Sequence, residues 1–244
     1  MKKVILIALV IGAWYFIFGN GGGIGHFWNA DHVKGTGDVV HRPLAVDAFH
    51  GITLQGSMDV MITPSNEQSV EVVAQQNIAD LVTTEVKNGV WNISTSDGFS
   101  TNEEFTINIK VPAMDKVKIQ GSGDIEGTDS FKADQVDLKI EGSGDIKMTY
   151  EASSVKAKIE GSGDIVLKGS CADLDLAIEG SGDVDSRGLQ CVNARTSIAG
   201  SGGIFVNATT TLDATIAGSG SVQYSGNPQL KKSVAGSGEV KKLD

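Results

Sequence analysis

The stretch "EGSGDI" at residues 141–146 returns at residues 160–165, and near copies read "QGSGDI" at 120–125 and "EGSGDV" at 179–184. Glycine pairs of this kind recur every 18 to 21 residues as far as residue 238. Such a period predicts a solenoid in which each repeat forms one coil and stacks on the next. Related stretches start at Gly35 and Gly56, and the 65 residues from Gly56 to Gly121 correspond to about three further periods.

Between the glycine pairs, apolar and polar residues alternate, as in "VDLKIE", "VKAKIE" and "LDLAIE". A period of two places Val136, Leu138 and Ile140 on one face of an extended strand, and no helical period of 3.6 is present. We therefore predict an all-β fold, a right-handed parallel β-helix with about 18–21 residues and two or three short strands per coil. A less regular N-terminal β portion precedes it.

The repeated glycines are predicted to form the corners of the coils, because glycine tolerates a positive φ where other residues clash. The neighbouring serine and aspartate can bond their own backbone and fix the turn. The predicted structural turns are Gly121, Gly123, Gly142, Gly144, Gly161, Gly163, Gly180, Gly182, Gly200, Gly202, Gly218, Gly220, Gly236 and Gly238.

The chain divides into four predicted parts. Two lysines and an apolar run form a signal peptide or N-terminal membrane anchor at residues 1–19, followed by a glycine-rich linker at 20–34. An irregular β portion at 35–117 leads into the regular repeats at 118–244. We expect export to the bacterial cell envelope, either anchored in the periplasm or at the cell surface. Membrane contact is expected only through residues 4–18.

The irregular portion carries strand-like stretches such as "SVEVVAQ", "GVWNIST" and "FTINIKV". Asn88-Gly89 predicts a tight hairpin turn, and "NIADL" predicts one helical turn.

Composition limits the partners. The formal net charge is −10, which disfavours nucleic acid and anionic lipid surfaces, while 40% hydrophobic residues suffice for a packed interior. A protein or glycan ligand remains open, and so does the oligomeric state.

Three segments in order, "HRPLAVDAFHGITLQGSMDVMIT", "NIADLVTTEVKNGVWNIST" and "VPAMDKVKIQGSGDI", followed by the GSGD repeats, resemble the GIN domain. That domain is labelled the head of "putative auto-transporter adhesins". The resemblance covers residues 35–240 and implies a right-handed β-helix in a bacterial envelope with a role in adhesion. It implies no catalytic residues.

One acidic residue follows each of the first four GSG corners. Stacked carboxylates repel unless they are hydrogen-bonded, screened or bridged by cations. Two readings stay open: turn-capping aspartates, which we favour, and weak Ca²⁺ sites, since Ca²⁺ prefers oxygen ligands. Later coils carry Gly203, Ser221 and Glu239 here, so a full metal ladder is excluded, and no dedicated cofactor is expected. The weak candidates are Asp124, Asp145, Asp164 and Asp183.

Cys171 and Cys191 each lie nine residues before a glycine pair. The same register in consecutive coils predicts that they are neighbours, within the range of a disulfide. An exported location would permit oxidation, and two stacked thiols are the alternative.

The sequence predicts no enzyme. The histidines at 26, 32, 41 and 50 match no zinc pattern and are expected at the surface. Only three arginines are present, and the outward columns show no catalytic cluster. The leading reading is an adhesin-like or protein-interaction scaffold. A membrane-tethered periplasmic structural or signalling module and a carbohydrate-active β-helix enzyme are the alternatives.

Overall fold

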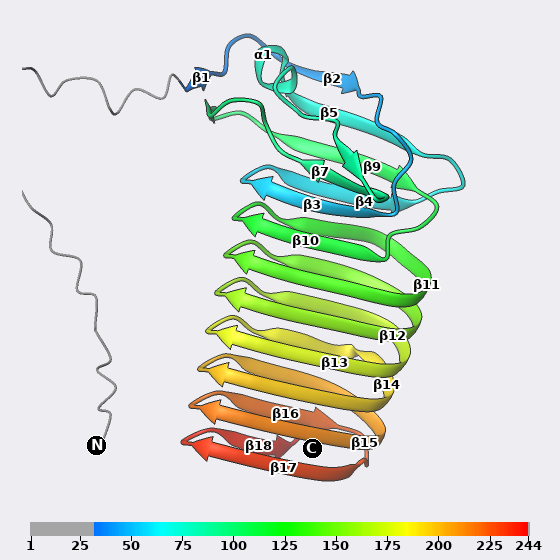
Figure 1. Ribbon diagram of the computed structural model, residues 1–244, viewed down its shortest axis with the longest axis vertical. Helices are drawn as coiled ribbons and strands as arrows, with labels where there is room; N and C mark the ends of the chain where they lie inside the picture. The colour runs from blue at the N-terminus through cyan, green and yellow to red at the C-terminus, as the bar shows by residue number, and fades with distance from the viewer. Residues whose placement is uncertain (1–31, 244) are drawn as a thin grey trace, which may run out of the picture. The chain divides into compact units, whose positions relative to one another are not determined.

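Parallel strands stack into a β-solenoid of about 7 turns in the computed structural model, which describes residues 32–243 (Figure 1). Strands account for 70% of the described residues and helix for 2%. The all-β parallel solenoid predicted from the glycine period is therefore confirmed. The predicted signal or anchor, and most of the glycine-rich linker, lie outside the described residues.

Each regular coil is one long strand, where the sequence predicted two or three short ones. The strand bends without losing its pairing, and register shifts near the bend, such as that between Glu126 and Ser130, absorb the curvature. We call the half after a glycine corner the back half and the half before the next corner the front half. The coil strands are β11 (Ile125–Gly142), β12 (Ile146–Gly161), β13 (Ile165–Gly180), β14 (Val184–Gly200) and β15 (Gly203–Gly218).

Equivalent aliphatic residues of successive coils lie in register inside the solenoid. Ile146 pairs with Ile165, which pairs with Val184, and all three side chains have 0% exposure. Burying one such side chain stabilises the fold by about 1.5–3 kcal/mol, and each depends on the coil above and below for its cover. The inward ladder inferred from the alternating sequence is confirmed.

The corners bring backbone directly against backbone. Gly161 has a φ of +145°, and a Cβ built there would lie 2.1 Å from the carbonyl oxygen of Gly142. The next glycine of the pair, Gly163, would place its Cβ 2.0 Å from the oxygen of Gly144. The first position of each pair thus requires glycine for two reasons, its positive φ and the lack of room for a Cβ between coils. The second position requires glycine only because there is no room for a Cβ.

The residues between Gly56 and Gly121 do not form three coils stacked in a row. Strand β3 (Gly51–Gly56) pairs with β10 (Lys116–Gly121), so Gly56 lies directly against Gly121. Strand β4 (Asp59–Pro64) pairs with the start of β11. No coil separates these two layers, although the 65 residues between the two glycines equal about three periods in length.

The intervening residues fold onto the other side of β3 and β4. Strand β7 (Val90–Ile93) pairs in parallel with β3, and β9 (Thr106–Val111) pairs in parallel with β4. Strands β7 and β9 therefore follow β3 and β4 in sequence, but they lie on the side of β3 and β4 that faces away from β10 and β11.

Antiparallel strands close this end of the solenoid (Figure 1). The turn at Asn88 and Gly89, with φ of 51° and 72°, makes the predicted hairpin, and "NIADL" contributes the predicted helical turn α1 (Gln76–Ala79). Because antiparallel strands do not continue the parallel coil, they act as a cap. The other elements here are β1 (Val33–Lys34), β2 (Val39–Pro43), β5 (Ser69–Gln75), β6 (Val86–Lys87) and β8 (Phe99–Ser100).

The opposite end consists of β16 (Ser221–Ser225), β17 (Gln229–Gly236) and β18 (Glu239–Lys242). Strand β17 pairs with β15, and every one of its residues is exposed. Within residues 32–243, no helix has the length and apolar character needed to cross a membrane.

Candidate functional site: an axial groove

Two columns of outward side chains run along the front halves of the coils, seven and five residues before each glycine pair. We call them the polar row and the charged row. They point outward because the residue between them, six before the glycine, points into the core. The polar row contains Ser154, Asp173, Asn193, Thr211 and Gln229, and the charged row beside it contains Asp175, Arg195, Asp213 and Lys231.

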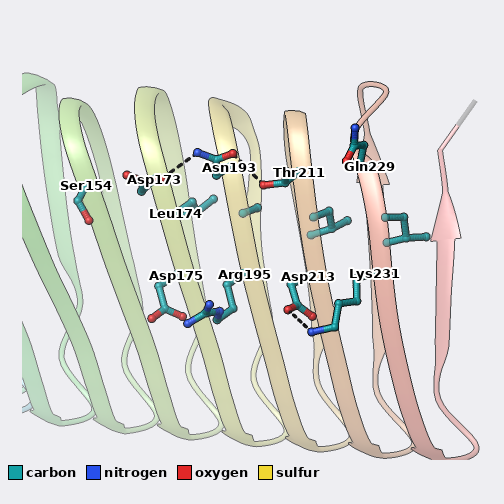
Figure 2. Close-up of a pocket in the computed structure, with 13 residues that line it drawn as sticks. Ser154, Asp173, Leu174, Asp175, Asn193, Arg195, Thr211, Asp213, Gln229 and Lys231 are labelled. Atoms are coloured by element: carbon teal, nitrogen blue, oxygen red, sulfur yellow. Dashed lines mark hydrogen bonds and ion pairs between the residues drawn. The ribbon is translucent and has the colours of Figure 1, made fainter.

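A groove of about 610 Å³ lies between the two rows (Figure 2). Between the rows lie Leu174, Ala194, Leu212 and Leu230; the first three have buried side chains that point into the core, and Leu230 is 37% exposed. The groove thus runs over strand backbone between two rows of polar and charged side chains, with apolar surface from Leu230 at its last coil.

Hydrogen bonds between coils hold the polar row in place. The Nδ2 atom of Asn193 donates to Oδ1 of Asp173 at 3.0 Å, and Oγ1 of Thr211 donates to Oδ1 of Asn193 at 2.8 Å. These bonds join three successive coils (Figure 2). Because each side chain is fixed by its neighbour, little side-chain entropy remains to be lost when a ligand binds.

The charged row alternates in sign from coil to coil. In register order the full column reads Lys116, Asp137, Lys156, Asp175, Arg195, Asp213 and Lys231. The Nζ atom of Lys231 lies 3.0 Å from Oδ2 of Asp213, whereas Arg195 makes no ion pair within residues 32–243. Alternation places opposite charges about 4.8 Å apart and removes the repulsion that a like-charged column would have. Three acidic and two basic side chains line the groove, so its field is nearly neutral.

A second charge network lies on the front halves of earlier coils, near the corners. Lys139 bridges Glu141 at 2.6 Å and Glu160 at 3.0 Å, and Lys158 bridges Glu160 at 2.6 Å and Glu179 at 2.8 Å. Hydrogen bonds from Lys139, Lys118 and Gln120 lower the pKa of Glu141 to about 2. The lysines therefore neutralise the glutamates that precede the corners.

The aspartate column forms a hydrogen-bond ladder. The Oδ1 atom of each aspartate accepts the backbone N–H of the residue one coil further on, for example from Asp183 to Asp164 at 2.8 Å. The ladder begins at Asp59 and ends where Asp183 accepts from Gly203 at 2.6 Å, because Gly203 has no side chain to continue it. Such bonds give the backbone N–H groups at the corners an acceptor and hold each corner against the next. The members between the two ends are Asp124, Asp145 and Asp164.

Within residues 32–243, no group of three or more His, Cys, Asp or Glu side chains is arranged to hold a metal ion. The weak Ca²⁺ sites stay a prediction. In the ladder, Oδ1 of each of these aspartates accepts a backbone N–H of the next coil, whereas the turn-capping reading expected a bond to the backbone of the aspartate's own turn.

Cys171 and Cys191 are register partners in β13 and β14, as their spacing predicted. Both are buried, and their sulfur atoms are not bonded in this structure. Hydrogen bonding to Cys171, together with burial, raises the pKa of the Cys191 thiol. Cys191 also donates to the carbonyl oxygen of Asn207 at 3.2 Å. The hydrogen bond between the two thiols lowers the pKa of the Cys171 thiol, and the disulfide stays a prediction.

Three of the histidines fall in the capped N-terminal portion, each beside a different partner. His41 lies 3.2 Å from Glu71, His50 lies 2.7 Å from Asp115, and His32 lies 3.4 Å from the oxygen of Phe99. The exposed rings of His41 and His50 agree with the expected surface positions. The fourth histidine, His26, lies outside the described residues.

The groove was not predicted from the sequence. The residues next to the glycines are the most repetitive, whereas those that line the groove differ from coil to coil. Alignment of the coils on their glycine pairs would have shown both the sign alternation at offset five and the amide and hydroxyl groups at offset seven.

The stacked parallel coils and the lateral groove define the class of the protein, a parallel β-solenoid. The chain belongs to the family described as "Putative auto-transporter adhesin, head GIN domain", which matches residues 48–228. No curated protein sequence matches the chain.

Solved structures share the fold. A "putative adhesin" from Bacteroides fragilis superposes with a TM-score of 0.81 at 24% identity, covering 86% of this chain and 100% of the other. A "putative adhesin" from Parabacteroides distasonis gives 0.70 at 25% identity, covering 87% and 100%. A "putative lipid binding protein" from the same species gives 0.75 at 24% identity, covering 88% and 100%.

Proposed function

We propose that this chain is an exported, non-enzymatic adhesion scaffold that binds an extended, uncharged, hydroxyl-rich chain such as a glycan in the axial groove. The groove itself carries the proposal: it crosses five coils, from that of Ser154 to that of Gln229. An elongated site of this kind suits a polymer better than a compact small molecule. The adhesin family supports the assignment to adhesion.

The chemistry of the walls supports a neutral glycan. Asp173, Asn193, Thr211 and Gln229 offer carboxylate, amide and hydroxyl groups, which pair well with sugar hydroxyls. Arg195 has five N–H donors and no ion-pair partner within the described residues, so it can donate to a ligand. A highly charged polymer gains little in this groove because the charges of the wall alternate in sign. The exposed side chain of Leu230 can cover the apolar face of a sugar ring at the last coil.

Attachment of cells tests the function. A strain that lacks this chain should attach less well, and the wild-type chain should restore attachment. Asn193→Trp should fail to restore it, because the indole would fill the groove at its centre. Gln190→Trp is the matched control, since Gln190 is an exposed residue of the same strand that does not line the groove. Equal attachment by all strains would reject the adhesin proposal.

Binding to immobilised neutral and acidic glycans tests the ligand class with the purified chain. We expect saturable binding to a neutral glycan, lost in Asn193→Trp and retained in Gln190→Trp. Binding to acidic glycans alone would contradict the neutral-ligand assignment. Protease treatment of intact cells, combined with N-terminal sequencing of the mature chain, tests export and the fate of residues 1–19. Full protection from protease would reject surface display.

A further inference from the structure

The outer edge of β17 differs from the rest of the stack in its interior residues. Leu230 continues the column of Leu212, and Val234 continues the column of Ile216. Leu212 and Ile216 are each 1% exposed, whereas Leu230 and Val234 are 37% and 40% exposed. The difference arises because β15 covers one side of each side chain and no described strand covers the other. At this edge the last side chains of the two apolar columns are therefore uncovered on one side.

The charges at this edge are basic, on a chain whose formal net charge is −10. Lys231 and Lys232 lie side by side in β17, and Lys241 and Lys242 lie in β18. Lys232 stands in an inward column, where its register partner is the buried Ala214. An inward-pointing charge and several lysines discourage two such edges from pairing with each other.

The columns specify which strand would fit next. The alternating charged row ends on Lys231, so its next member should be acidic. A second acidic residue is required opposite Lys232, because an inward lysine covered by an apolar strand would be a buried, unpaired charge. Apolar residues are required opposite Leu230 and Val234.

We propose that the β17 edge binds an extended acidic segment of a partner protein, which adds to the solenoid as a further parallel strand. Main-chain hydrogen bonds along β17 supply affinity, and the two lysines select acidic partners and reject basic ones. The residues of β15 that lie against β17, "TLDATIAG" at 211–218, give a template for such a segment. Replacement of its first alanine by aspartate gives TLDDTIAG, which meets each requirement of the columns.

Fluorescence anisotropy with labelled peptides and the full chain tests this binding mode. We expect TLDDTIAG to bind saturably and TLKKTIAG to bind at least about tenfold more weakly, because two favourable cross-strand pairs become unfavourable. The double variant Lys231→Glu, Lys232→Glu should invert this preference. Lys132→Glu, which lies at another exposed site of the solenoid, should leave it unchanged. Binding that ignores both charge reversals would overturn the proposal.

Backbone methylation separates strand addition from simple charge attraction. In a β-strand, alternate residues direct their N–H groups to opposite edges. Two peptides with N-methyl groups on odd or on even residues should therefore differ, with one set abolishing binding and the other retaining it. Equal binding by both would overturn strand addition. Sedimentation tests a second copy as the occupant: dimers that the Lys231→Glu, Lys232→Glu variant abolishes would overturn the assignment to an acidic partner.

Discussion

Substitution of alanine for single glycines tests the claim that the corners need both a positive φ and space between coils. Three positions separate these requirements. Gly37 has a φ of +82° with no atom within 4 Å of a built Cβ, so Gly37→Ala meets only the backbone penalty. Gly163 has no left-handed φ but a Cβ contact of 2.0 Å, and Gly161 combines a φ of +145° with a contact of 2.1 Å.

The expected losses in the free energy of unfolding follow from these contacts. Gly37→Ala should lose about 1–2 kcal/mol, the cost of a left-handed conformation for an L-residue. Gly163→Ala should lose about 2–3 kcal/mol, because the facing carbonyl belongs to backbone that is paired on both sides and cannot move freely. Gly161→Ala should lose the sum, about 3–5 kcal/mol.

Equilibrium urea unfolding, followed by circular dichroism, measures all three differences under the same conditions. The slopes of the transitions should agree if each variant unfolds from the same folded state. The order of the three losses in the free energy of unfolding then tests the claim. If Gly161→Ala were no more harmful than Gly37→Ala, close stacking of the corners would not be the reason for the repeated glycine.

Three further predictions concern other contacts of the solenoid. Asp164→Ala should lose about 1 kcal/mol, because the N–H of Asp183 loses its acceptor, whereas Asp164→Asn keeps Oδ1 and should be nearly neutral by urea unfolding. The folded-state pKa of Glu141 is lowered to about 2, so its stabilising contribution should be complete above its ordinary pKa near 4.5 and should vanish as the pH falls towards 2. Urea unfolding across this range should show a flatter pH profile for Glu141→Gln, and identical profiles would contradict the ion-pair network. Mild oxidation should link Cys171 to Cys191 within one chain, because the two residues are register partners. Mass spectrometry after alkylation measures the product, and disulfide-linked dimers in place of the intrachain bond would contradict this pairing.

The regular half of the fold was readable from the sequence because the same contacts recur in every coil. A glycine period together with an alternating strand fixes both the corner and the inward face, so the sequence alone predicts that Ile146 pairs with Ile165. The thiol pair followed from the same register. In the regular coils, the local preferences for corners and strands agree with the way that the coils stack.

The N-terminal layers could not be predicted in the same way. The spacing of 65 residues from Gly56 to Gly121 is compatible with three coils or with an insertion, and periodicity alone does not distinguish them. The choice depends on non-local pairing of β3 with β10, whose energy comes from the match of two edges far apart in sequence. The groove was missed for a related reason. Its walls arise from columns across coils, and no single repeat contains the alternation that ends at Lys231.

The interleaved order of the first layers has a consequence for how the molecule is made. The layer of β3 and β4 lies between β7 with β9 on one side and β10 with β11 on the other, so both of its neighbours are synthesised after it. When residue 64 leaves the ribosome, neither edge of this layer has a partner strand. Each later repeat, in contrast, can pair with the preceding repeat as soon as it has been synthesised. Acquisition of structure should therefore be delayed until residue 127 is free and should then advance rapidly towards the C-terminus. A chaperone that shields unpaired strands would matter most during that first interval.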